Sequence, residues 1–236
     1  MDFFSIMIIL IALVVFVFIV LIAFVMKKSK DVKTQEFLEA ERKELLQNVL
    51  KKRKKLGSHK TGFYSQITNA MTFQRTVAVT NSKIAGLVYD TNRKPIVAFE
   101  RVERGLNVKG QLVAVTKKQQ FVYEFQGLEI TLFCDSELLG SWDTKGILYD
   151  VNKKAIGQLK RIQETNSLIL HNKTIATIEK APVYNDAISE VSEVFEEMNY
   201  GTPLLSLENS PTSTEETWLT ALTIFEITFF GNPRVA

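Results

Sequence analysis

Residues 86–96 read Gly-Leu-Val-Tyr-Asp-Thr-Asn-Arg-Lys-Pro-Ile, and residues 146–156, offset by sixty, read Gly-Ile-Leu-Tyr-Asp-Val-Asn-Lys-Lys-Ala-Ile. Each stretch is typical of an apolar strand that ends in tyrosine, a tight Asp-x-Asn-basic turn, and a return strand. Asp and Asn suit such turns because they tolerate positive φ angles. A second copy at a fixed offset indicates a duplicated hairpin. The pair therefore predicts a fold built from serial antiparallel hairpins.

Further short apolar runs follow the same plan as far as residue 178, with polar turns at 135–137 and 171–173. In 119–125 aromatic residues occupy every second position, which places them on one face of a strand. The spacing implies on the order of eight strands or more. A sandwich or a closed barrel is the architecture that hides the edges of so many strands.

The C-terminal segment 218–230 carries large apolar side chains in nearly every direction around a helix, after a first turn at 214–216 that resembles a capped one. A helix that is apolar all round must be buried on all sides. With about fourteen residues and Glu226 inside it, the helix is too short and too charged to be a good membrane span. We therefore expect a mainly β fold, a closed barrel filled by this helix.

A second helical pattern lies over 186–199, with Asn185 as its N-cap, an apolar face, and several glutamates on the other side. The glutamates indicate a solvated helix face rather than a calcium site, because no glycine-turn loop groups them around an ion.

The hairpins with Asp/Asn turns at 89–92 and 149–152, together with the closing hydrophobic helix 218–230, carry a family resemblance. The sequence resembles the tubby C-terminal-like superfamily, which includes tubby, phospholipid scramblase and LURP-one-related proteins. The resemblance covers roughly residues 61–232 and implies a closed barrel of about twelve strands threaded by the C-terminal helix. It also implies contact with phosphoinositides or other anionic lipids, as in some relatives.

The chain departs from the scramblases in several respects. It has no match to their acidic calcium-binding stretch and no cysteine-rich palmitoylation run, and its predicted anchor is N-terminal. Scrambling activity is therefore not carried over from the resemblance.

The N-terminal run 3–26 contains a single polar residue, Ser5, and no charge, glycine or proline. A helix of this length spans about 36 Å, and a hydrocarbon core is about 30 Å thick. Lys27 and Lys28 follow the run, whereas a cleaved secretory signal has its basic stretch before a shorter apolar run. We expect an uncleaved anchor, domain 1–26, that crosses the cell membrane once. The positive-inside rule puts the N-terminus outside and the remainder in the cytoplasm.

Residues 27–60 form a basic arm with twelve Lys or Arg against five Asp or Glu, a net charge of about +7. Its stretch 32–56 is rich in helix formers and carries a thin apolar stripe that suits a helix partner or an interface. The arm ends in an unbroken basic run, which consists of Lys51, Lys52, Arg53, Lys54 and Lys55.

This basic run has two readings. It is either a solvated topology signal or a site for anionic lipids, where each basic residue gains about 1 kcal/mol within a Debye length of about 8 Å. Nucleic acid is not expected, because aromatic residues are not interleaved with the basic ones. The repeated turns offer a second candidate lipid patch, although hairpin lysines also serve to protect sheet edges. The residues of this turn patch are Arg93, Lys94, Lys153 and Lys154.

The sequence contains none of the common catalytic or nucleotide-binding motifs. Nucleotide-binding glycine motifs, the Gly-x-Ser-x-Gly elbow and His-Glu-x-x-His are absent from the sequence. A single cysteine, Cys134, excludes an internal disulfide framework and a multi-cysteine zinc site, and two histidines leave little for any other metal site. We expect no catalytic residues, no cofactor and no metal, and therefore not an enzyme.

The sequence thus predicts an anchor, the arm, and a tubby-like barrel domain over 61–236. The expected function is non-enzymatic: the cytoplasmic barrel binds anionic lipid headgroups or a protein partner at the membrane surface. The alternatives are a structural or interaction subunit of a membrane complex, joined through the arm or the acidic helix 186–199, and a protein of the lipid scramblase type.

Overall fold

The computed structural model of the chain describes residues 11, 13–24, 35–58, 62–78, 81–104, 109–127, 129–162, 165–179, 193–194 and 203–228. A single antiparallel sheet of thirteen strands dominates it, in the order β12-β1-β2-β3-β4-β5-β6-β7-β8-β9-β10-β11-β13. With few exceptions each strand therefore lies beside the strand that follows it in the chain, as serial hairpins require.

The strands in chain order are β1 Ile67–Ala78, β2 Asn81–Asp90, β3 Pro95–Arg104, β4 Lys109–Val115, β5 Gln120–Gln126, β6 Glu129–Cys134, β7 Glu137–Asp143, β8 Ile147–Tyr149, β9 Ala155–Ile162, β10 Thr165–Leu170, β11 Lys173–Glu179, β12 Glu193–Val194 and β13 Leu205–Leu207. The helices are α2 Gln35–Arg53, the 3₁₀ turn η1 Phe63–Gln66, and α3 Ser213–Thr228.

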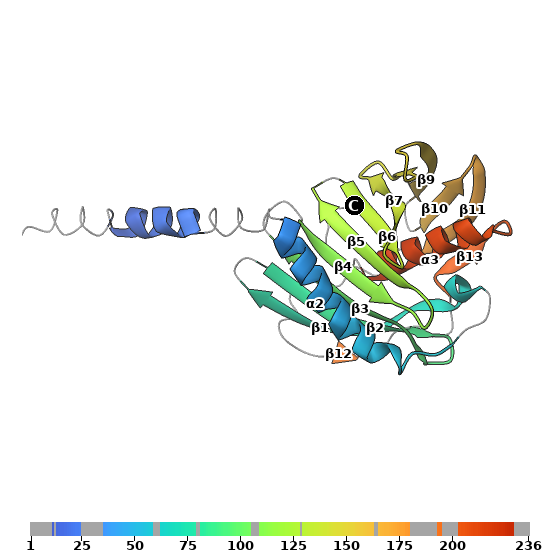
Figure 1. The fold of residues 1–236 in the computed structure, drawn as a ribbon, viewed down its shortest axis with the longest axis horizontal. Coiled ribbons are helices and arrows are strands. Elements are labelled where there is room, and N and C mark those ends of the chain that lie inside the picture. The colour runs from blue at the N-terminus through green and yellow to red at the C-terminus, as the bar shows by residue number, and fades with distance from the viewer. Residues whose placement is uncertain are drawn as a thin grey trace, which may run out of the picture. The chain divides into compact units, whose positions relative to one another are not determined.

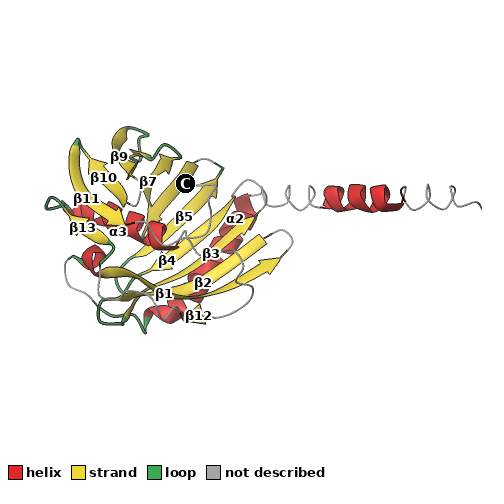
Figure 2. Ribbon diagram, turned by 180° about the vertical axis from the view of Figure 1, so that it is seen from behind, coloured by secondary structure: helices red, strands yellow, loops and turns green. Residues whose placement is uncertain are grey.

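The sheet curls up on itself (Figures 1 and 2), and twelve of its thirteen strands make a nearly closed barrel. The two ends of the curl meet where Thr68 of β1 bridges Pro203, just ahead of β13. The next amide, that of Leu204, donates to the carbonyl oxygen of Ile67 over 2.8 Å. The prediction of a mainly β, barrel-like fold with a C-terminal helix is confirmed.

The repeated sequence forms two matching hairpins, β2–β3 and β8–β9. In the first turn Asp90 Oδ1 accepts from the amides of Asn92 and Lys94 at 2.9 and 2.8 Å. In the second, Asp150 Oδ1 accepts from the amides two and four residues on, both at 2.9 Å. Arg93 and Lys153 adopt φ of 60° and 61° at equivalent positions. The duplicated hairpin thus has one local structure, held in each copy by the aspartate side chain.

Helix α3 fills the barrel. Its side chains are buried all round, and Trp142 of the wall meets Phe225 edge to face at 5.0 Å between ring centroids. Tyr123 of β5 donates its hydroxyl to the carbonyl oxygen of Ala221 over 2.7 Å. Inward and outward positions alternate along the strands, so that Phe99 faces the helix whereas Ala98 faces outward.

Both ends of α3 are tied down. At its start Thr212 and Glu215 form a capping box, with the Thr212 amide donating to Glu215 Oε2 over 2.7 Å. The cap therefore lies two residues earlier than the 214–216 turn suggested. At its end the fully buried Arg101 donates to the carbonyl oxygen of Thr228 over 2.6 Å. Burial lowers the pKa of Arg101, and its ion pair with Glu103 at 3.0 Å opposes that shift.

The part of α2 from Lys43 onward covers the outer face of β3, β4 and β5 (Figure 1). The apolar stripe seen in the sequence accounts for this, because Leu45, Val49 and Leu56 are buried against valines of the three strands. Below the helix, the buried carboxylate of Glu100 lies 2.5 Å from Lys83 Nζ. The compact unit that holds the barrel spans Lys43–Ala236 and so includes the second half of α2.

Two predictions fall largely on residues outside the described ranges. The helix predicted over 186–199 is wrong at the two residues that are described: Glu193 and Val194 form β12, which pairs with Thr72 and Phe73 of β1. An open ladder on β1 accounts for this, since pairing with it satisfies backbone groups that a helix would satisfy internally.

Of the predicted anchor, residues 11 and 13–24 are described, and they are helical. The remainder of the run 3–26 lies outside the described residues. Of the helices that the structure describes, none has the length and apolar character needed to cross a membrane.

Candidate functional site

The hairpin topology gathers alternate turns at one end of the barrel. Antiparallel neighbours reverse direction, so the β2–β3 turn at 91–94 and the β4–β5 turn at 116–119 share an end. Helix α2 also terminates there, because the amide of Gly57 donates to the carbonyl oxygen of Pro95 over 2.8 Å. The basic run of the arm and the first basic turn, separate in the sequence, are therefore neighbours in the fold.

A reciprocal clasp fixes the end of α2 to the β4–β5 turn. Arg53 Nε donates to the carbonyl oxygens of Thr116 and Lys117, both at 3.1 Å. In return Lys117 Nζ donates to the carbonyl oxygen of Lys54 over 3.4 Å, which places a positive charge at the C-terminal end of the helix. The basic run is thus mounted on the barrel rather than carried on a free arm.

The remaining basic side chains of this region point outward. Lys51, Lys54 and Lys55 of the arm are exposed, and so are Lys94 and Lys118 of the two turns. Among the described residues no acidic side chain forms an ion pair with these lysines. We call this surface the basic end, and define it by Lys51, Lys52, Lys54, Lys55, Arg93, Lys94 and Lys118.

Sequence reasoning missed Lys117 and Lys118. Both lie in a turn that the strand pattern around 119–125 already implied, and counting turns along the chain would have put it at the same end as 91–94. The sequence therefore contained the information that locates Lys117 and Lys118, but its use requires knowledge of the order of the strands around the barrel. Asp135 of the next turn lies beside this surface, where its carboxylate accepts from the amide of Gln120 at 2.9 Å.

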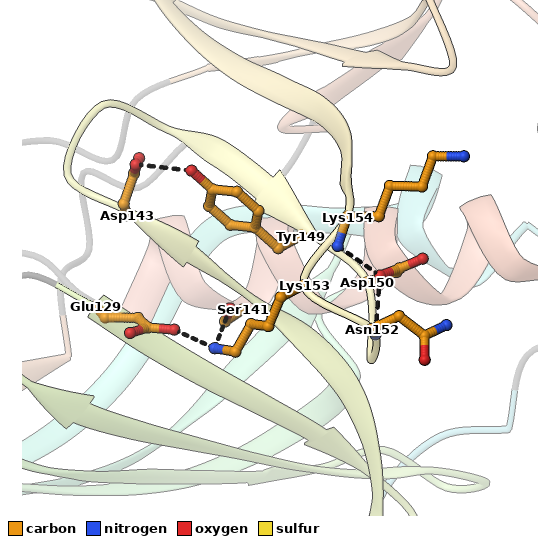
Figure 3. A network of polar contacts seen from close by, with 8 residues as sticks. All are labelled: Glu129, Ser141, Asp143, Tyr149, Asp150, Asn152, Lys153 and Lys154. Carbon is orange, nitrogen blue, oxygen red and sulfur yellow. Dashed lines mark hydrogen bonds and ion pairs between the residues drawn. The ribbon is translucent and has the colours of Figure 1, made fainter.

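The two lysines of the second basic turn differ: Lys153 is held in an ion pair, whereas Lys154 is exposed. Lys153 Nζ lies 2.5 Å from Glu129 Oε1 and 3.3 Å from Ser141 Oγ, so that its side chain lies against β6 and β7 (Figure 3). The hydrogen bond from Lys153 lowers the pKa of Glu129, with burial opposing the shift. Lys154 is exposed, and in Figure 3 it points away from this network. The structure thus separates Lys153 from the residues of the basic end.

The contact between Ser141 and Lys153 does not make an activated nucleophile. The lysine ammonium is held by Glu129 and donates to the serine oxygen, so it has no lone pair with which to accept the serine proton. Nearby, Tyr149 donates to Asp143 over 3.3 Å, and burial together with this carboxylate raises the pKa of the tyrosine. The network of Figure 3 is a structural clasp for the β8–β9 turn.

The cysteine and the described histidine do not form a reactive site either. Burial raises the pKa of the Cys134 thiol to about 12, and Asp135 adds to the shift. His171 Nδ1 lies 3.5 Å from Glu215 in the capping box of α3. Within the described ranges, no group of three or more His, Cys, Asp or Glu side chains could hold a metal ion. The basic end is the strongest functional candidate that these residues offer.

Comparisons of the chain with family models, with characterised proteins and with solved structures find no match. A barrel around a helix does not by itself identify a superfamily.

Proposed function

We propose that this chain is a non-enzymatic, single-pass membrane protein whose cytoplasmic barrel binds anionic lipid headgroups through the basic end. The observation that carries the proposal is the convergence of lysines from α2 and two hairpin turns on one surface. The apolar run 3–26 and the lysines that follow it support the anchor and its orientation.

The free energy of lipid binding is larger for several basic residues on one surface than for a single basic residue. A basic residue near an anionic leaflet gains about 1 kcal/mol, and only within a Debye length of about 8 Å. If the basic run lay on a separate helix, an upright orientation of that helix would carry the run more than a Debye length away from the membrane. Because the run is clasped to the barrel beside Lys94 and Lys118, docking of one end of the barrel brings all these charges within range together.

Membership of the tubby C-terminal-like superfamily is part of the same proposal. It is supported by the twelve-stranded, nearly closed barrel and by the buried C-terminal helix. A structural or interaction subunit of a membrane complex remains the second candidate. The apolar stripe of the arm, however, is no longer a candidate interface for it. Leu45 and Val49, the apolar stripe of the arm, are buried against the barrel and are not available to a partner helix.

The test uses the full chain in nanodiscs of phosphatidylcholine, alone or mixed with phosphatidylserine. A fluorophore is attached at Thr91→Cys, on an exposed turn of the basic end, in a Cys134→Ser background, and is quenched by a lipid-borne quencher. We expect quenching in the mixed discs, reversal by high salt, and loss in the variant Lys51→Gln, Lys54→Gln, Lys55→Gln.

A matched probe at Thr76→Cys controls for contact by any part of the barrel. Thr76 is exposed on β1, toward the opposite end from the β2–β3 turn. Equal quenching at Thr76 and Thr91, or quenching at Thr91 that is indifferent to anionic lipid and to the lysine substitutions, would refute the proposed contact.

A further inference from the structure

The basic end presents six lysines and one arginine, Arg93, on a fixed frame. They come from three separate elements, the C-terminal turn of α2 and the two hairpin turns. Arg53 donates its Nε to two backbone carbonyls, so the side-on edge of its guanidinium that includes Nε is not available to a phosphate. Apart from the guanidinium of Arg93, the remaining charges are ammonium groups, which are point charges without a preferred direction of approach.

Several backbone amides of the two turns are occupied as well. A phosphate group is commonly held by several free N–H groups of a turn. In the β4–β5 turn the amides of Lys118 and Gln119 donate to Thr116 Oγ1 at 3.3 and 2.9 Å. In the β2–β3 turn the amides of Asn92 and Lys94 donate to Asp90. Neither turn therefore offers these amides to a headgroup phosphate.

We infer that the basic end reads the charge density of a bilayer rich in monovalent anionic lipids, and not the phosphates of an individual headgroup. This inference rests on the membrane contact proposed above. The six lysine ammonium groups, mounted on one frame, gain from any negative charge that comes within screening distance. Because the charges are mounted on one frame, they engage together, and occupancy should rise steeply with the anionic fraction of the surface.

The experiment titrates two anionic lipids in nanodiscs that hold the full chain with the Thr91→Cys probe. One series contains phosphatidylserine, and the other contains a phosphatidylinositol bisphosphate at the same total negative charge. We expect the two quenching curves to coincide within about twofold on the charge axis. Lys94→Gln and Lys118→Gln should each move the midpoint to a higher charge density, by about twofold.

Lys160→Gln is the matched control, because Lys160 is an exposed lysine on β9, away from the two turns of the basic end. Its curve should superimpose on that of the unmodified chain. A shift equal to that of Lys118→Gln would mean that total protein charge, and not the basic end, sets the response, and would overturn the inference.

The remaining outcomes separate the inference from the proposed function. A response to the bisphosphate at low mole fraction, with none to phosphatidylserine of equal charge, overturns charge-density reading but leaves the membrane contact standing. No response to either lipid overturns both. If poly-glutamate then bound the chain and Lys94→Gln weakened that binding, the surface would belong to an acidic protein partner.

Discussion

The guanidinium of Arg101 donates a hydrogen bond of 2.6 Å to the carbonyl oxygen of Thr228, so that a strand of the barrel wall caps the C-terminal end of the central helix from inside. The last carbonyls of a helix carry partial negative charge and lack intrahelical partners. A buried cation at this position stabilises the helix end where water cannot.

We expect Arg101→Met to destabilise the full chain by about 3 to 5 kcal/mol, because it removes the cation from a buried pair and leaves Glu103 and the carbonyl without this partner. Urea unfolding in detergent, followed by tryptophan fluorescence, measures the loss. Trp142 and Trp218 both lie in the barrel core and report its integrity.

The duplicated sequence supplies the control for this change. Arg161 occupies the position sixty residues after Arg101 but is exposed. Arg161→Met should change the free energy of unfolding by no more than about 0.5 kcal/mol. Equal losses at the two arginines would show that general charge, and not the cap on α3, accounts for the effect.

Gly140→Ala should be among the most damaging single-methyl changes in the barrel. Gly140 has φ of 154°, and a Cβ there would lie 2.1 Å from the carbonyl oxygen of Tyr149 and 2.9 Å from the Trp218 ring. Neither the backbone nor a packed indole can yield cheaply, so we expect a loss of about 3 kcal/mol or more. Gly127→Ala is the comparison, because it shares a positive φ but has open space, and should cost about 1 kcal/mol. Comparable thermal midpoints for the two variants would contradict this account.

Much of this fold could be predicted because its signals are local. The Asp-x-Asn-basic turns depend on contacts within five residues, such as Asp90 to Lys94, so both copies could be read directly. The all-round apolar pattern of α3 predicted burial without any knowledge of what surrounds it. By contrast, the two residues of β12 pair with a strand more than a hundred residues earlier, and no local pattern encodes such a partner.

Only part of the candidate site could be predicted, because its charge clusters are local in the sequence whereas their proximity depends on long-range packing. The basic run and the turn at 93–94 could be found as charge clusters, but their proximity depends on the apolar stripe of α2 docking on β3 to β5. Lys153 looked equivalent to Arg93 in the repeat. What distinguishes it is Glu129, which the sheet order brings to it across β7.

The ion pair of Lys153 and Glu129 predicts a defined pH dependence. The folded-state pKa of Glu129 lies below its unfolded value, so the pair stabilises the fold above about pH 4.3 and the contribution disappears as pH falls through the folded-state pKa. Both side chains are about half exposed or more, so solvent screening limits the contribution to about 0.5 kcal/mol.

Carbon-13 NMR of the Glu129 carboxyl tests this assignment. In Lys153→Met the titration midpoint should rise toward that of a free glutamate, and the stability difference from the parent chain should vanish at the lowest pH. An unchanged midpoint would show that Lys153 is not the cause of the shift.

Cys134 should be a poorly reactive thiol. With a pKa raised to about 12 by burial and by Asp135, it is almost entirely protonated at pH 8, and thiolate is the reactive form. Reaction with a disulfide reagent should therefore be at least tenfold slower in the folded chain than in urea. Asp135→Asn should raise the rate by removing one cause of the shift. Rapid labelling of the folded chain at neutral pH would contradict this placement of the thiol.

The packing of α2 on the barrel can be tested by separating its effect from that of the interior. Leu45 is buried at the outer face of the strands, whereas Leu50 of the same helix is 37% exposed. Leu45→Ala should cost about 3 kcal/mol and Leu50→Ala less than about 1 kcal/mol, since only the first leaves a cavity. Because Leu45 packs outside the wall, Trp142 and Trp218 should keep their native emission in both variants at low denaturant. Equal costs for the two leucines would mean that the helix is not docked, and the lysines of the basic run would then be free of the barrel.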